Sequence, residues 1–232
     1  MESDRQQDEQ ETILVLWHRS EGVFSQNRYD GHHSRLFGAK RIETSSILLT
    51  APHAVNHFLN EGNELKVADL YTGGLVRALG HVKGIAVAFN CARHPAINPH
   101  LGATPLDGLV GKFMRARNGG MIVDVHGCKN NPDFDIAIGV GGDEALQRQE
   151  WLITTLKKSA EQCGLRVAIN PEGYQGKNHR SLVSRHRGAF NNLAIVQLEI
   201  SKELRDPSGN RRGSIVAALT DTIDLALSHG LR

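Results

Sequence analysis

Three largely apolar segments of this chain carry a side chain that can bind a metal ion or accept a proton. His53 follows the first segment, His126 follows the second, and Glu199 lies within the third. Imidazole nitrogens and a carboxylate oxygen can hold zinc at about 2.0–2.2 Å and leave a fourth position for water. A further carboxylate near that water could act as a general base. These residue types are therefore consistent with metal-assisted hydrolysis.

Two more carboxylates extend the candidate set. Glu64 follows His53 by eleven residues, and Asp124 precedes His126 by two. An unpaired carboxylate inside an apolar strand is costly, which makes Glu199 the candidate for the general base. Asp124 could orient a histidine through a hydrogen bond, or it could be a solvated strand end.

Each of these residues also has an ordinary structural interpretation. A histidine after a strand is commonly a hydrogen-bonded loop residue, Glu199 could pair with an arginine, and Glu64 could complement the dipole of a helix in its first turn. The sequence has no His-Glu-x-x-His motif and no Cys/His finger pattern. His57 follows His53 by four residues, but the preceding strand and Pro52 argue against a helix there. We therefore expect His57 to be a loop residue.

Alternating strands and helices are expected to position these side chains. The predicted strands are 12–17, 47–51, 84–89, 121–125, 134–138, 165–169 and 193–200. The predicted helices are 64–79, 109–117, 144–163 and 214–229, and residues 19–40 are expected to form a long loop or hairpin. This alternation predicts an α/β three-layer sandwich with a central, mostly parallel (mixed) sheet. Sites in such folds lie beyond the carboxyl ends of strands.

Composition limits the partners and the compartment. Residues 1–11 are polar and acidic and are expected to be a disordered leader, with a single domain over 12–232 and no signal peptide. No apolar run is long enough to cross a membrane. The net charge of +2 is too small to indicate nucleic acid or a membrane as the main partner. Three cysteines without a Cys-x-x-Cys motif favour a reducing cytoplasm, and nothing indicates an oligomeric state.

The order of the motifs resembles that of the N-formylglutamate amidohydrolase (deformylase) family, whose fold is similar to that of the zinc carboxypeptidases. The matching segments are LLTAPHA at 48–54, Glu64 seven residues before Tyr71, NCARHP at 90–95, VDVHG at 123–127, PDFDIAIG at 132–139, YQG at 174–176 with SRH at 184–186, and VQLEI at 196–200. The chain departs from the pattern at Val55 and Gly127, where the family has glycine and serine, and by two extra residues in NCARHP. These departures leave the substrate open.

The resemblance implies a zinc-dependent amidohydrolase that cleaves a C–N bond in an N-acyl amino acid such as N-formylglutamate. It implies one zinc ion per chain, or another divalent metal, bound by His53, Glu64 and His126. Asp69 and Glu61 are alternatives for the third ligand. Glu199 would be the catalytic carboxylate.

A small substrate that carries a carboxylate needs a cationic partner, and arginine can bind a carboxylate through two hydrogen bonds. Arg93 and Arg185 are the candidates, with His186 beside the latter. The basic stretch 177–187 could equally be a solvated surface. Two other functions stay open: a zinc peptidase or cell-wall-type amidase of the same fold, and a binding protein that keeps the fold without activity.

Overall fold

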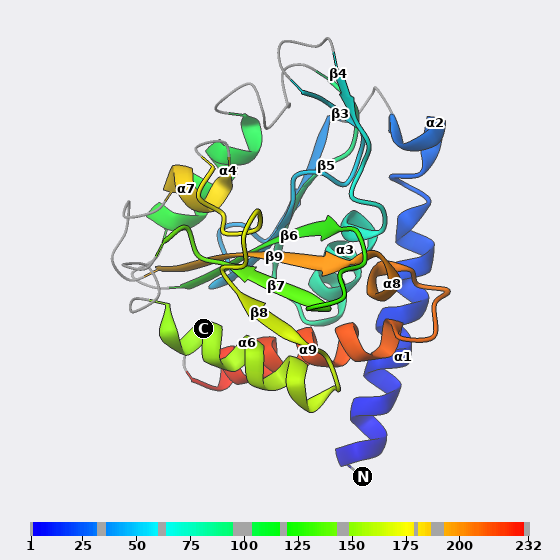
Figure 1. Cartoon of the computed structure of the whole chain (residues 1–232), viewed down its shortest axis with the longest axis vertical. Coiled ribbons are helices and arrows are strands. Elements are labelled where there is room, and N and C mark those ends of the chain that lie inside the picture. Colours follow the sequence, from blue (N-terminus) through cyan, green and yellow to red (C-terminus); the bar gives the residue numbers. More distant parts are fainter. Residues whose placement is uncertain are drawn as a thin grey trace.

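A seven-stranded sheet runs through the centre of the computed structural model (Figure 1), which describes residues 2–31, 36–59, 64–94, 104–116, 120–142, 149–178, 181–186 and 193–229. In spatial order its strands are β1 (Phe37–Lys40), β5 (Ala86–Asn90), β2 (Ile47–Ala51), β6 (Gly120–Cys128), β9 (Leu193–Ser201), β7 (Ile136–Gly139) and β8 (Val167–Ile169). Strands β5, β2, β6 and β9 are mutually parallel, β1 and β7 run antiparallel to their neighbours β5 and β9, and β8 is parallel to β7. The predicted mixed, mostly parallel sheet is confirmed.

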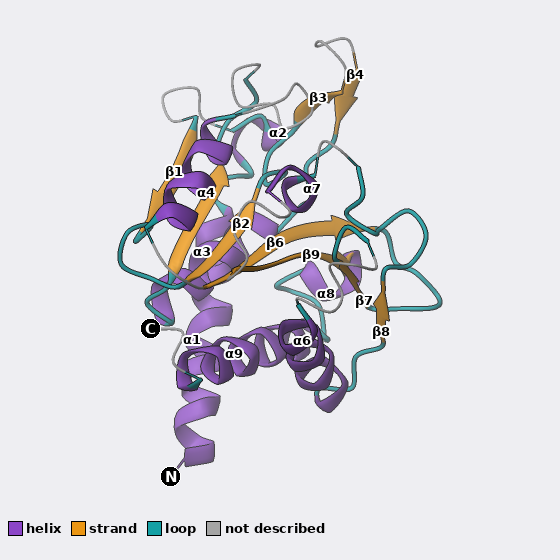
Figure 2. Cartoon of the chain, turned by 90° about the vertical axis from the view of Figure 1, so that its left-hand side faces the viewer, coloured by secondary structure: helices purple, strands orange, loops and turns teal. Residues whose placement is uncertain are grey.

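Helices cover both faces of this sheet and complete three layers (Figure 2). The larger helical layer contains α1 (Glu2–Glu21), α3 (Thr72–Val82), α6 (Glu150–Gln162) and α9 (Arg212–Ser228). The opposite face carries α4 (Pro105–Arg115) and α7 (Leu182–His186). Two short helices, α2 (Gln26–Tyr29) and α8 (Lys202–Arg205), and a hairpin of β3 (His57–Leu59) with β4 (Glu64–Lys66) lie at the edges.

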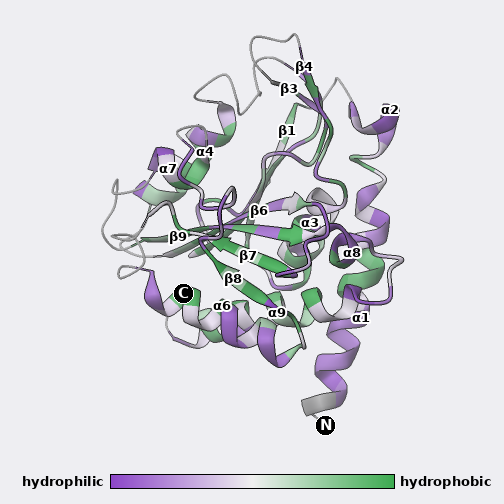
Figure 3. Ribbon diagram, viewed as in Figure 1, coloured by the Kyte–Doolittle hydropathy of each residue, from purple (hydrophilic) through white to green (hydrophobic). Residues whose placement is uncertain are grey.

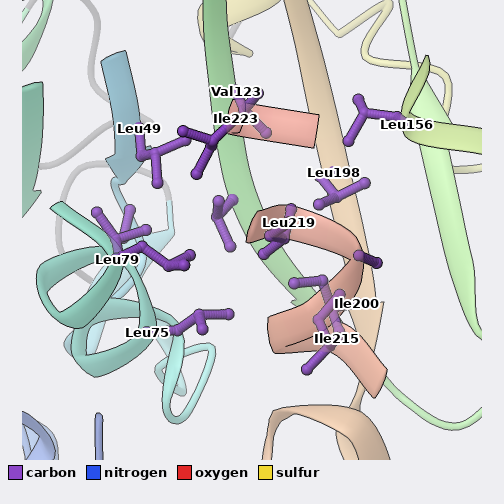
Figure 4. Packing of buried hydrophobic residues seen from close by; sticks show 14 of the residues in the cluster. Leu49, Leu75, Leu79, Val123, Leu156, Leu198, Ile200, Ile215, Leu219 and Ile223 are labelled. Carbon is purple, nitrogen blue, oxygen red and sulfur yellow. The ribbon is translucent and has the colours of Figure 1, made fainter. Parts of the chain in front are cut away.

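The main hydrophobic core lies between the sheet and the larger helical layer (Figure 4). Leu49, Val123 and Leu198 point from the central strands into this core, where they meet aliphatic side chains of α3 and α9. The hydropathy colouring shows the same division, with apolar central strands and polar outer helix surfaces (Figure 3). No helix within the described ranges is long and apolar enough to span a membrane.

The amino-terminal region differs from the prediction. Residues 2–11, expected to be a disordered leader, form the first half of α1, and the predicted strand 12–17 is wrong because this segment continues the same helix. Ile13 and Trp17, four residues apart, are fully buried, whereas Val15 between them is half exposed. A short apolar run fits a buried strand or one face of a helix. Here the burial of every fourth residue is the pattern of a helix. The single-domain assignment of 12–232 stays a prediction.

The other elements follow the prediction more closely. The six predicted strands from 47–51 to 193–200 correspond to β2, β5, β6, β7, β8 and β9. The predicted helix 64–79 is correct only from residue 72 onward, because Glu64–Lys66 form β4 and Tyr71 takes a left-handed conformation (φ 71°) just before α3. The expected loop 19–40 holds the end of α1, α2 and β1, while 32–35 lie outside the described residues.

Candidate active site

The candidate site lies where one face of the sheet changes from apolar to polar along the strands. The first row of side chains, which packs beneath α4 and α7, consists of Leu48, Ile122 and Ile195. Two residues further along, the same face carries a polar row of Thr50, Asp124 and Gln197, and His126 and Glu199 then lie opposite each other. Because side chains alternate along a strand, the register alone brings these groups to one edge.

Asp124 fixes the orientation of His126. Its carboxylate is fully buried; one oxygen accepts a hydrogen bond from the Thr50 hydroxyl, and the other lies 2.8 Å from Nε2 of His126. A carboxylate can only accept, so Nε2 carries the proton. Nδ1 is then the ring nitrogen that faces Asp69, with its carboxylate oxygen 3.7 Å away. In metal sites a ligating histidine is commonly oriented by a carboxylate that does not itself bind the metal, and Asp124 has this position relative to His126.

The site concentrates negative charge. Burial lowers the pKa of His126, but Asp124, Glu199 and Asp69 outweigh burial and raise this pKa to about 9. Burial raises the pKa of Glu199, and His126 opposes the shift while Asp69 adds to it. Gln197 donates a hydrogen bond of 2.8 Å to one oxygen of Glu199. Buried carboxylates around one point favour a bound cation.

His53, in the turn that follows β2, meets His57, the first residue of β3. Both side chains are buried, and their rings stack with centroids 4.2 Å apart. The His53 ring also lies 4.8 Å from that of His126, edge to face. His57, which we expected to be an ordinary loop residue, therefore belongs to the same cluster. The spacing of four residues was the available signal, and a turn over 52–55 brings the rings together without a helix.

Asp69 takes the place beside the histidines that the sequence assigned to Glu64. The Asp69 amide donates to the carbonyl of His53 (2.8 Å), and its carboxylate accepts from the amide of Gly127 (3.1 Å). Glu64 instead is exposed and lies on β4, two residues from Lys66. Since His57 pairs with Lys66, Glu64 lies two residues, or roughly 7 Å, further along the strand and away from His57. Asp69, and not Glu64, is thus the carboxylate that lies beside His126.

Helix α1 holds the segment that carries Asp69. The indole nitrogen of Trp17 donates to the carbonyl of Tyr71 (2.9 Å). The buried carboxylate of Glu21 accepts from the amides of Tyr71 (2.9 Å) and Gly74 (3.1 Å). These bonds satisfy free amides at the start of α3, where a carboxylate also complements the helix dipole. Helix α1, whose first half was expected to be a disordered leader and whose second half was expected to contain a strand, therefore positions Asp69.

Two imidazoles and a carboxylate are suitable ligands for a divalent metal, and the spacing between Nδ1 of His126 and the Asp69 oxygen is close to that of two ligands of one metal. At 3.7 Å, Nδ1 of His126 and the Asp69 oxygen are too far apart for a hydrogen bond. Two ligands of one tetrahedral zinc lie about 3.4 Å apart at normal bond lengths. Within the described ranges, no three His, Cys, Asp or Glu side chains already surround one point. Binding therefore requires an imidazole, such as that of His53, to turn toward this pair.

A cleft of about 380 Å³ opens over His53, His126 and Glu199, whereas Asp69 lies beneath its lining beside His126. His53, His126 and Glu199 line it from the sheet side, and Lys66 and Lys177 bring positive charge to it. The opposite wall is the loop 173–178, which passes so close to β7 that a side chain at Gly139 would collide with its backbone. A larger groove of about 640 Å³ between α1, α6 and α9 contains none of the predicted site residues.

The predicted substrate-binding residues are engaged elsewhere. Arg185 Nε lies 2.7 Å and His186 Nε2 3.2 Å from a carboxylate oxygen of Asp107, which forms a capping box at the start of α4. Arg93 pairs with Asp30 at 2.8 Å and lies over the ring of Phe58. The described lining of the cleft includes none of the three. Among the described residues, Lys66 and Lys177 and not these arginines bring positive charge to the cleft. Residues 179–180 and Glu61 lie outside the described residues.

Comparison with known proteins supports the fold. No protein-family model and no curated protein matches the chain. Solved structures do: N-formylglutamate amidohydrolase from Ralstonia eutropha JMP134 (TM-score 0.60, 14% identity, 83% of this chain and 97% of that one), gene product Atu2144 from Agrobacterium tumefaciens (0.56, 17%, 84% and 96%) and a bacteriophage poly-gamma-glutamate hydrolase (0.54, 15%, 85% and 92%). At this identity the similarity confirms the fold implied by the sequence resemblance.

Proposed function

We propose that this chain is a metal-dependent hydrolase that cleaves the amide C–N bond of a carboxylate-bearing substrate, most simply an N-acyl amino acid such as N-formylglutamate. The observation that carries the proposal is the meeting of His53, Asp69, His126 and Glu199 at one edge of the sheet. Two of the similar structures are named as hydrolases of glutamate derivatives, which agrees with this chemistry.

The metal ligands that we assign are His126 through Nδ1, Asp69 and His53. When bound, a divalent metal supplies a water of lowered pKa and polarises the substrate carbonyl. Asp124 keeps a proton on Nε2 of His126, so Nδ1 is the ring nitrogen that must lose its proton to act as a ligand. The hydrogen bond from the Asp69 amide to the His53 carbonyl keeps these two residues at a fixed separation. Asp69 therefore replaces Glu64 in the ligand set.

Glu199 is suited to move the proton. Gln197 holds one carboxylate oxygen, which leaves the other for the nucleophilic water. Burial raises the pKa of Glu199, so the group is a stronger base than an exposed glutamate. It accepts the proton from water and returns it to the leaving nitrogen, so that the carboxyl group is regenerated as carboxylate.

Lys66 and Lys177 account for the preference for an acidic substrate. Lys66 lies close enough to Glu199 to affect its ionisation, and both lysines line the cleft. A lysine ammonium is a compact point charge on a flexible stem, suited to a carboxylate at the end of a small substrate.

The test combines metal analysis with a substrate panel. Purified protein is stripped with chelator, reloaded with zinc, manganese or cobalt, and assayed on N-formyl and N-acyl amino acids and on γ-glutamyl peptides. We expect one metal per chain and metal-dependent release of amine from an acidic substrate. The Asp69→Asn variant should lose metal, whereas Glu64→Gln should keep it. Turnover by metal-free protein would contradict the proposal.

A further inference from the structure

Arg205 is a buried cation behind the candidate site, and it has no part in the proposed hydrolysis reaction itself. It is the last residue of α8, next to the ends of β6 and β9 (Figure 1), and only 5% of its surface is exposed. Its guanidinium donates from Nε to the carbonyl of Ile200 (2.9 Å), from Nη2 to that of Cys128 (3.0 Å) and from Nη1 to that of Leu70.

Each of these carbonyls belongs to a segment that carries a site residue. Leu70 directly follows Asp69, Ile200 directly follows Glu199, and Cys128 lies two residues after His126. One planar group with fixed donor directions therefore ties three separate parts of the chain together. Small displacements of such segments matter, because catalytic groups act within a narrow range of positions.

Gly127 leaves the space that this guanidinium occupies. A Cβ atom at Gly127 would overlap Cζ of Arg205 and lie 2.6 Å from Nη1. The same glycine donates its amide to the carboxylate of Asp69 (3.1 Å). The absence of a side chain at Gly127 thus permits the contacts of Arg205, while the backbone amide of the same residue binds Asp69.

Burial makes this cation costly, and buried carboxylates compensate for it. Burial lowers the pKa of Arg205, while Asp69, Glu199 and Glu21 oppose the shift. Arginine stays charged under such conditions. An unpaired buried charge would be strongly destabilising, so the position of this side chain is set by both its carbonyl partners and the carboxylates around it.

We propose that Arg205 is a positioning residue that keeps Asp69, His126 and Glu199 in the relative positions needed for metal binding and hydrolysis. The role in hydrolysis rests on the proposed function. The role in positioning rests on the three hydrogen bonds of the guanidinium alone and can be measured without turnover.

The first experiment compares Arg205→Met and Arg205→Lys with Arg211→Met. Arg211 binds Asp135 through two hydrogen bonds, and neither residue lines the cleft, so the loss of Arg211 controls for general destabilisation. Replacing residues that support metal ligands commonly lowers metal affinity or activity by about 10–100-fold. We expect losses of this size in metal affinity and kcat, with KM nearly unchanged, for Arg205→Met, a smaller loss for Arg205→Lys, and none for Arg211→Met.

A second pair of variants removes no charge. Gly127→Ala introduces the methyl group that displaces the guanidinium, and Gly213→Ala adds the same group where it meets no atom within 4 Å. We expect Gly127→Ala to reproduce the losses seen for Arg205→Met and Gly213→Ala to change neither metal affinity nor kcat. Combining Gly127→Ala with Arg205→Met should add little, because both act on the same contact. If Arg205→Met does not fold, this pair decides the question.

Hydrogen exchange separates this proposal from the proposed function. The amides of Asp69 and Gly127 both donate within the site, so their exchange in metal-free protein should accelerate at least about tenfold in Arg205→Met, beyond any change in the centre of β6. Unchanged exchange at these amides, or equal effects of Arg205→Met and Arg211→Met on them, would overturn the positioning role. A parent protein that binds no metal and cleaves no amide refutes the proposed function, while the exchange result still decides the role of Arg205.

Discussion

Replacing Asp124 by asparagine should weaken metal binding while leaving the fold intact. The substitution keeps the size of the side chain and removes its charge. An asparagine oxygen can still accept from Nε2 of His126, and its amide group can face the hydroxyl of Thr50, which is the present partner of the other oxygen. The geometry is therefore retained, and the electrostatic support of the imidazole is lost.

The expected magnitude follows from the character of the bond. A hydrogen bond to a charged group contributes about 1.5–3 kcal/mol, against about 0.5–1.5 kcal/mol for a neutral one. The loss of charge should therefore cost about 1–2 kcal/mol at this fully buried position. This corresponds to roughly a 5-fold to 30-fold weaker affinity for zinc.

The assay is competition for zinc between the protein and a chromophoric chelator, at fixed pH and salt. Asp107→Asn is the matched control, because Asp107 is also buried and paired but supports α4 rather than the site. That control should lower Tm and leave zinc affinity unchanged. Equal zinc affinity in the parent and Asp124→Asn would refute the assignment of Asp124 as the residue that orients His126.

Three further outcomes are expected. Glu199→Gln should fold and bind metal but lose about 10²–10⁴-fold in kcat, whereas Glu203→Gln, at an exposed site, should keep activity; a fully active Glu199→Gln would remove this residue from proton transfer. Lys66→Met should raise KM about tenfold for substrates with a side-chain carboxylate but not for neutral analogues, which paired Michaelis–Menten curves would show. Hydrogen bonds from Arg211 hold the pKa of Asp135 below its ordinary value, so the stabilising contribution of this carboxylate is present above about pH 4 and is lost as the pH falls further. Asp135→Asn should therefore flatten the acid side of a plot of Tm against pH, and an unchanged slope in this variant would contradict the prediction.

The central sheet could be predicted from the sequence because its strands are continuous apolar runs. Residues 47–51, 121–125 and 193–200 are buried on both faces, so their composition alone separates them from surface segments. The register that places His126 opposite Glu199 then brings the chemistry of two strands to one edge. These parts of the site depend on strand ends, which a sequence shows well.

The carboxylate that completes the proposed ligand set could not be chosen from the sequence, because its position depends on contacts between residues far apart in the chain. The position of Asp69 beside the histidines depends on the turn at Tyr71. Trp17 and Glu21 of α1 hold that turn through hydrogen bonds to the backbone of Tyr71. The apolar run that contains Trp17 fits a strand as well as a helix. Once that segment is misassigned, the support of the turn cannot be seen, and Glu64 is an equally good candidate.

The most direct test of this account is a crystal structure of the zinc-loaded protein with anomalous data collected at the zinc absorption edge. We predict one anomalous peak in the cleft, at about 2.0–2.2 Å from Nδ1 of His126 and from a carboxylate oxygen of Asp69, with Nε2 of His126 still bonded to Asp124. A peak bound by Glu64 without Asp69, or no peak in this cleft at saturating zinc, would contradict the proposed site.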